Sequence, residues 1–195
     1  MKRLFVLGDS ISIDYGPELE RLTKGIFHYD RKGKNAAPGD LDRGGQANGG
    51  DSSNCLAYLR ESFPAADLVL LNCGLHDIKI YGGQRQVADS AYRRNLNAIF
   101  KLASTHAVTP VWLRTTPVDD ETHRLCCPLF QRFNRDVIAC NAIADEVTAA
   151  WGVVAIDLYG FTLSLGPDCY RDHVHFKPEF AAAQARFIAS KLISF

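Results

Sequence analysis

Three residues of the types that form a serine nucleophile site stand near opposite ends of the chain. Ser10 follows a short apolar run, residues 4–7, and the pair Gly8-Asp9, whereas Asp172 and His175 stand three residues apart near the other end. A serine hydroxyl becomes a nucleophile when a histidine removes its proton, and a carboxylate on the second ring nitrogen orients that histidine. The spacing of Asp172 and His175 lets both side chains lie on one side of a loop or helical turn. The sequence therefore predicts Ser10 as nucleophile, His175 as base and Asp172 as the orienting acid.

The elements that must position these residues alternate along the chain. Apolar runs predict five strands, at residues 4–7, 26–29, 67–73, 108–113 and 153–156. Helices are expected between or after them, at residues 17–22, 51–64, 86–105, 128–151 and from 178 onward. This alternation predicts a doubly wound α/β sheet with helices on both faces. Ser10 and the 169–176 segment each follow the carboxyl end of a strand, so the fold brings them to one sheet edge.

Composition narrows the class of protein and of ligand. A chain of 195 residues that is 47% hydrophobic is expected to form one domain over residues 1–195. The 22 basic and 22 acidic residues cancel, which disfavours nucleic acid and anionic membranes as partners and favours a small ligand. No apolar stretch approaches the length of a bilayer span or of a secretory signal, so a cytoplasmic location is expected. The sequence leaves the oligomeric state open.

Acyl transfer also needs hydrogen-bond donors for the oxyanion that forms on the carbonyl. Two glycine-marked segments offer backbone amides: residues 49–52, where a loop meets a helix start, and residues 74–77, directly after the third strand. The amide of Ser10 is a further candidate. The glycine-rich segment 33–50 has the composition of a functional or disordered loop. Its Arg43, Gln46 and Asn48 offer hydrogen-bonding groups, which favours a polar substrate such as an acetylated sugar.

Four short motifs in this order resemble the SGNH (GDSL) hydrolase family over nearly the whole chain. They are Gly8-Asp9-Ser10, Gly50 before Asp51-Ser52-Ser53, Gly74-Leu75-His76-Asp77 and Asp172-His173-Val174-His175. The resemblance implies a flavodoxin-like three-layer α/β/α sandwich with a five-stranded parallel sheet, and oxyanion donors from the N–H groups of Ser10 and Gly50. It also implies a serine esterase that acts on small acyl esters and needs no metal or other cofactor. Asp9, Asn48 and Asp77 are expected to contact the substrate.

One position departs from the family pattern. The third motif of the family usually reads Gly-x-Asn-Asp, with the asparagine amide donating to the oxyanion, but His76 stands at that position here. A neutral imidazole can donate one hydrogen bond, so we expect His76 to serve as the third donor. Such a donor would depend on tautomer and pH in a way that an amide does not.

Several alternatives stay open from the sequence. The substrate is a short-chain or O-acetyl ester, or else a lysophospholipid or thioester, and a non-catalytic glycan-binding relative is also possible. A metal-dependent hydrolase using His173 and His175 is a further alternative, although no metal is expected. His173 itself is expected to face solvent or to lie behind the triad. The six cysteines are expected to be reduced thiols, with Cys126-Cys127 in a loop.

Overall fold

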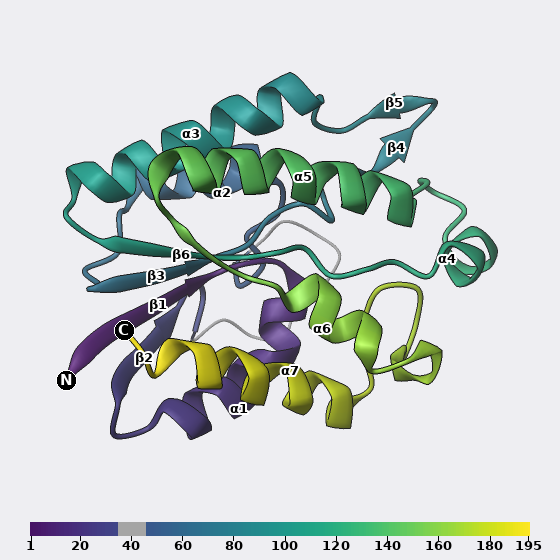
Figure 1. The fold of residues 1–195 in the computed structure, drawn as a ribbon. Helices are drawn as coiled ribbons and strands as arrows, with labels where there is room; N and C mark the ends of the chain where they lie inside the picture. The colour runs from purple at the N-terminus through teal and green to yellow at the C-terminus, as the bar shows by residue number, and fades with distance from the viewer. Residues whose placement is uncertain (35–45) are drawn as a thin grey trace.

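A five-stranded parallel sheet forms the centre of the molecule, in a computed structural model that describes residues 1–34 and 46–195 (Figure 1). Its strand order is β2-β1-β3-β6-β7. The strands are β1 (Lys2–Leu7), β2 (Phe27–Arg31), β3 (Leu68–Leu71), β6 (Thr109–Leu113) and β7 (Val154–Ile156). The five predicted strands and their parallel arrangement are confirmed.

Burial follows position in the sheet. The central strands β1 and β3 pair in register from Leu4 with Leu68 to Leu7 with Leu71, and all four residues of β3 are buried. A strand with neighbours on both sides and helices on both faces has no solvated face, which explains why its residues are continuously apolar. The edge strand β7 is different, because Val154 is half exposed.

Helices cover both faces of the sheet and make three layers (Figure 1). One face carries α1 (Ser10–Thr23), α6 (Leu158–Ser164) and α7 (Pro178–Leu192). The other face carries α2 (Ser52–Glu61), α3 (Asp89–Thr105) and α5 (Asn134–Trp151). The predicted α/β/α sandwich is therefore confirmed.

Several helices begin at other residues than the sequence predicted. The first helix begins at Ser10 and not near Pro17, because the Asp9 carboxylate accepts the Ile11 amide at 3.0 Å and caps it. Pro17 consequently lies inside α1, where its missing N–H removes one helical hydrogen bond. The helices expected from residues 86 and 128 begin at Asp89 and Asn134.

Short elements were missed because they span too few residues for a periodic pattern. They are the hairpin β4 (Ile80–Tyr81) and β5 (Gln84–Arg85), the helices α4 (Asp120–Cys126) and α6, and a 3-10 turn at Pro167–Cys169. The expected loop at Cys126-Cys127 is thus wrong for Cys126, which is the last residue of α4, while Cys127 caps that helix. All six cysteines are free thiols, as expected.

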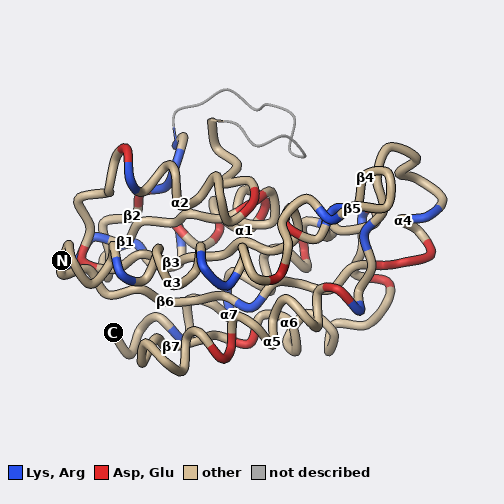
Figure 2. The backbone as a smooth tube through the Cα atoms, turned by 90° about the horizontal axis from the view of Figure 1, so that it is seen from above, with Lys and Arg blue, Asp and Glu red and all other residues tan. Residues whose placement is uncertain are grey.

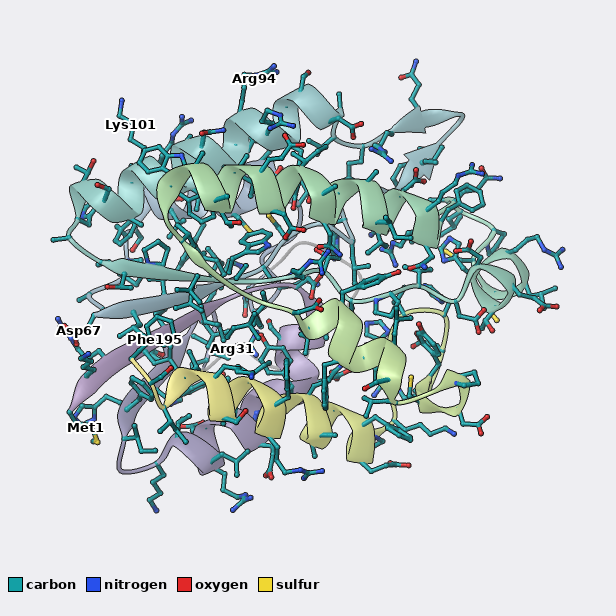
Figure 3. All side chains as sticks on the ribbon, viewed as in Figure 1. Met1, Arg31, Asp67, Arg94, Lys101 and Phe195 are labelled. Carbon is teal, nitrogen blue, oxygen red and sulfur yellow. The ribbon has the colours of Figure 1, made fainter. Side chains whose placement is uncertain are left out.

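Surface charges of both signs are interspersed along the chain (Figure 2). Arg94 and Lys101, for example, extend from α3 into solvent (Figure 3). Among the helices of the described residues, none combines the length and the apolar composition that crossing a bilayer requires.

Candidate active site

The three residues predicted for the triad meet in one chain of hydrogen bonds. Ser10 Oγ lies 2.8 Å from His175 Nε2, and His175 Nδ1 lies 2.8 Å from Asp172 Oδ2. The other carboxylate oxygen of Asp172 accepts the amides of Val174 and His175 at 2.9 and 2.8 Å. Both distances along the side-chain path lie within the normal hydrogen-bond range, so the arrangement can pass a proton from serine to histidine.

Ser10 is held at the junction of β1 and α1. It is the first residue of the helix, and its side chain is almost fully buried, with 3% of the residue exposed. An amide at the first helical position has no acceptor inside the helix, and it lies at the positive end of the helix dipole. The Ser10 N–H is therefore suited to stabilising negative charge next to its own hydroxyl.

The hydrogen bonds around Asp172 favour its ionised form. Burial raises the pKa of this carboxyl, but the hydrogen bonds from the His175 ring and from two backbone amides outweigh burial and hold the pKa well below its usual value. An ionised carboxylate only accepts hydrogen bonds, so the proton of neutral His175 is assigned to Nδ1. Nε2 then presents a lone pair to the Ser10 hydroxyl, as a general base requires.

The loop that carries Asp172 and His175 is tied to the helix that begins at Ser10. Tyr170 and Phe176 form an antiparallel bridge that closes the loop, and the Arg171 amide donates to the His175 carbonyl at 2.8 Å. The Arg171 guanidinium donates to Asp14 Oδ2 on α1 at 3.2 Å. These contacts link His175 to α1 through backbone and side chain.

The segment 48–52 lies against the same sheet edge. The Gly49 amide donates to the Gly8 carbonyl at 2.8 Å, and a Cβ on Gly49 would lie only 2.9 Å from that oxygen. The Ser52 amide donates to both carboxylate oxygens of Asp77 at 3.0 Å. The segment is thereby joined to Gly8, which follows β1, and to Asp77 of the 74–77 motif, which the sequence placed after the third strand.

Two basic residues that the sequence analysis did not single out hold this segment from β2. Arg31 is half-buried and donates to the Ser12 carbonyl at 2.8 Å and to the Ala47 carbonyl at 3.1 Å. Lys32 Nζ donates to the Asn48 carbonyl at 2.9 Å. The available signal was a basic pair directly after a predicted strand, but such pairs are usually solvated, so the signal is weak.

Asn48 connects the backbone of this segment to His76. Asn48 Oδ1 accepts the Gly50 amide at 2.8 Å, and Asn48 Nδ2 lies 3.5 Å from His76 Nε2. Gly50 itself has φ +71°, a backbone conformation that favours glycine. Because the amide oxygen faces Gly50, the amide nitrogen faces His76, and Nε2 is assigned as the acceptor.

His76 is neutral across the physiological pH range. Burial lowers its pKa to about 2, and the positive charges of Lys79 and Arg132 act in the same direction. The charge of this side chain therefore does not change with pH over that range. Only 4% of His76 is exposed, which fits a residue that packs inside the site wall.

Lys79 and Arg132 form a buried cationic pair that the sequence analysis also missed. Their charged groups lie 4.5 and 5.1 Å from the ring centroid of Phe130, and both residues are buried. Cations over an aromatic face are stabilised by its quadrupole. Arg132 also opposes the rise that burial causes in the pKa of Asp9.

The residues expected to contact substrate are buried and bonded within the protein. Asp9 caps α1, Asp77 binds the Ser52 amide, and Asn48 binds the Gly50 amide. Their substrate contacts stay a prediction. Gln46 is exposed, and its carbonyl accepts from Lys32 Nζ at 2.7 Å, whereas Arg43 lies outside the described residues.

His173 does not face solvent, which leaves the other expected position, behind the triad. It is buried, and its ring lies against that of His123, with the centroids 4.7 Å apart and the planes at 69°. His175 is directed instead to Ser10 and Asp172. The two histidines of the His-x-His motif therefore contact different residues.

Comparison with solved structures identifies this fold. The chain aligns over 100% of its length with 96% of a lipase/acylhydrolase from Enterococcus faecalis, at TM-score 0.71 and 16% identity. It aligns over 97% of its length with 99% of the acetyl xylan esterase AlAXEase, at TM-score 0.73 and 14% identity. A GDSL-like lipase from Bacteroides thetaiotaomicron has TM-score 0.68 and 15% identity, with 99% of this chain and 88% of the other aligned. The protein thus has the α/β/α fold of these structures.

Sequence comparison adds nothing to this likeness. No protein-family model matches the chain, and no curated protein matches it.

The buried neutral His76 should make folding stability depend on pH. Its pKa is about 2 in the folded protein and about 6.5 when unfolded, so between these values the unfolded chain binds more protons. The free energy of unfolding of the wild type, relative to His76→Asn, should therefore fall as pH decreases below about 6.5. Urea denaturation of both proteins from pH 4 to 8 measures this difference. A difference that is constant with pH would contradict the assigned neutral state.

Proposed function

We propose that the protein is a serine esterase that hydrolyses small acyl esters through an acyl-enzyme on Ser10. The observation that carries this proposal is the continuous hydrogen-bond path from Ser10 Oγ through His175 to Asp172, with 2.8 Å at each side-chain step. A solvated aspartate and histidine have no reason to adopt this geometry with a buried serine. The shared fold with esterases and acylhydrolases supports the same reaction class.

Each residue has a distinct role in the two steps of the proposed reaction. His175 Nε2 takes the proton as Ser10 Oγ bonds to the ester carbonyl carbon, and the resulting imidazolium is stabilised by Asp172. His175 then protonates the leaving alkoxide as the carbon–oxygen bond breaks, which leaves the acyl group on Ser10. A water molecule, deprotonated by the same nitrogen, attacks the acyl-enzyme, and His175 returns that proton to Ser10 Oγ as the carboxylic acid leaves.

The oxyanion site draws on donors from two segments. The Ser10 N–H lies at the positive end of α1, and Asn48 and Gly50 lie on the segment that is fixed against Gly8. The Gly50 N–H donates to Asn48 Oδ1 in this structure. This hydrogen bond must break before the Gly50 N–H can donate to the substrate oxygen. We assign the Asn48 amide nitrogen to the role that asparagine of the third motif has in the family, with His76 holding its orientation.

Exposure of the catalytic groups favours a short acyl chain. Ser10 and His175 are each 3% exposed, so a bulky acyl group has little room beside the nucleophile. Gln46 is exposed at the start of the segment that Arg31 and Lys32 hold, and its side-chain amide is a polar group for the alcohol side of the ester, which supports an acetylated carbohydrate. The acetyl xylan esterase among the similar structures is consistent with that class. A lysophospholipid or thioester is the alternative substrate.

Loss of a triad residue should abolish turnover of p-nitrophenyl acetate. Ser10→Ala removes the nucleophile and His175→Ala removes the base, so each should lower kcat by about 10⁴-fold or more. Asp172→Asn no longer holds His175 in the required tautomer and should lower kcat by about 10⁴-fold. A fluorophosphonate should label Ser10, as intact-protein and peptide mass spectrometry would show. Ser104→Ala, which changes an exposed serine of α3, is the matched control and should leave both measurements unchanged. Labelling at another serine would contradict the proposal, as would retained activity in Ser10→Ala.

The pH dependence of kcat/KM should follow the protonation of His175, together with that of Asp77, whose pKa burial raises to about 7. Only its neutral form accepts the serine proton, so kcat/KM should rise with pH as this imidazole loses its proton. Asp172 stays ionised over this range because its pKa is held low. His76→Asn should show the rise at the same pH, since His76 is neutral throughout. A profile independent of pH between 5 and 8, a range of about 1.5 units on either side of a free histidine, would count against the triad.

Substitutions at residues 48 and 76 separate the two candidate donors. If the Asn48 amide binds the oxyanion, Asn48→Ala should lower kcat by about 10²–10³-fold with little change in KM. His76→Gln, which can still contact Asn48, should then cost less than Asn48→Ala. The opposite order, with His76 variants losing more turnover than Asn48→Ala, would assign the donor to the imidazole. Initial rates over a range of p-nitrophenyl acetate concentrations give kcat and KM for each variant.

A further inference from the structure

A second cluster of chemically reactive side chains lies beside the triad loop. His123, Cys127 and His173 each offer one atom that can bind a metal, and these atoms all lie within 4.8 Å of one another. Two of the residues come from α4 and its cap, and the third comes from the loop that carries Asp172 and His175. In Figure 1, α4 and the loop between α6 and α7 lie at the same end of the molecule.

Local structure places the two ligands of α4 on one face. His123 and Cys127 are four residues apart, and the Cys127 amide donates to the His123 carbonyl at 3.0 Å, which continues the helical pattern. Side chains at this spacing are neighbours on a helix surface. The third ligand is fixed to the same helix start, because the Asp119 amide donates to the His173 carbonyl at 3.1 Å.

The protonation state of His123 suits metal binding. Its Nε2 lies 3.1 Å from the Phe130 carbonyl oxygen, so this nitrogen carries the proton and donates it. Its Nδ1 is then a lone-pair donor atom, and among the described residues it has no hydrogen-bond partner although His123 is only 2% exposed. Histidines that bind a metal through one ring nitrogen typically donate the N–H of the other ring nitrogen to an acceptor such as a backbone carbonyl. Burial lowers the pKa of His123 to about 4, so the ring is neutral at physiological pH.

The donor set and spacing select the class of ion. Two imidazole nitrogens and one thiolate are preferred by Zn²⁺, whose tetrahedral geometry places neighbouring ligand atoms roughly 3.4–3.6 Å apart. The three atoms lie within 4.8 Å of one another, so each pair must approach by at most about 1.4 Å on binding. Arg132 contributes positive charge near His123, while the Cys127 thiolate formed on binding and the nearby Asp172 carboxylate contribute negative charge.

We propose that His123, Cys127 and His173 form a zinc site that joins α4 to the loop carrying the acid and base of the triad. The site differs from the His173–His175 pair that the sequence suggested, and it takes no part in the attack on the ester. Its fourth position is left to water or another small ligand. Bound zinc would fix the position of His173, one residue from Asp172 and two from His175. The proposal does not depend on the esterase function.

Zinc binding by untagged protein, purified with a chelator and then dialysed, tests the site. Competition with a chromophoric chelator should show one Zn²⁺ bound per chain, and Co²⁺ should give tetrahedral visible bands with a thiolate-to-cobalt charge-transfer band. Cys127→Ser should weaken binding by roughly 100-fold or more, because it removes a ligand outright, and should remove the charge-transfer band. Cys126→Ser changes the adjacent, exposed cysteine and is the matched control, which should bind as the wild type does.

A thermal measurement distinguishes loss of the site from loss of the fold. Zinc should raise the Tm of the wild type and of Cys126→Ser, since it binds the folded state, and should not raise that of Cys127→Ser. Equal Tm values without metal would show that all three proteins fold alike. The proposal is overturned if the wild type binds no zinc, if Cys127→Ser binds zinc as tightly as the wild type, or if Cys126→Ser loses binding to the same extent.

Discussion

The proposed chemistry depends on one hydrogen bond, between Ser10 Oγ and His175 Nε2. It joins residues 165 positions apart, and neither end is a rigid element on its own. Ser10 is fixed because β1 leads directly into α1, and His175 is fixed because its loop is closed by a backbone bridge and tied to α1 through Arg171. A shift of about 1 Å at either end would break the path for the proton, so the parallel sheet, which fixes both ends at one edge, is what the proposed chemistry requires.

Most of the fold and the triad could be predicted from the sequence because their signals are local and strong. A run such as that around Leu68 to Leu71 is apolar on both faces, which only a central parallel strand requires. Asp172 and His175 are close in sequence, so their contact follows from spacing alone. Helix starts were less predictable. The first helix begins at Ser10 because the Asp9 carboxylate caps it, although the proline seven residues later suggested a later start.

The parts that could not be predicted depend on contacts between distant residues. Arg31 binds carbonyls of both α1 and the segment before Asn48, and no periodic pattern marks such a role. The same holds for His123 and His173, whose rings meet although they are fifty residues apart. The sequence shows a histidine at position 76, where an asparagine was expected. The structure places the amide of Asn48 next to His76, so an asparagine amide is present in the site at a different position in the sequence.

The contact between Asp77 and Ser52 gives the oxyanion segment a property of its own. Burial raises the pKa of Asp77 to about 7, although the Ser52 hydrogen bonds oppose this shift. In slightly acidic solution the carboxyl becomes neutral, and a neutral acid accepts hydrogen bonds more weakly than a carboxylate does. The anchor that holds residues 48–52 to β3 is therefore stronger in alkaline than in acidic surroundings. The positioning of the proposed oxyanion donors consequently varies with the acidity of the compartment in which the protein works.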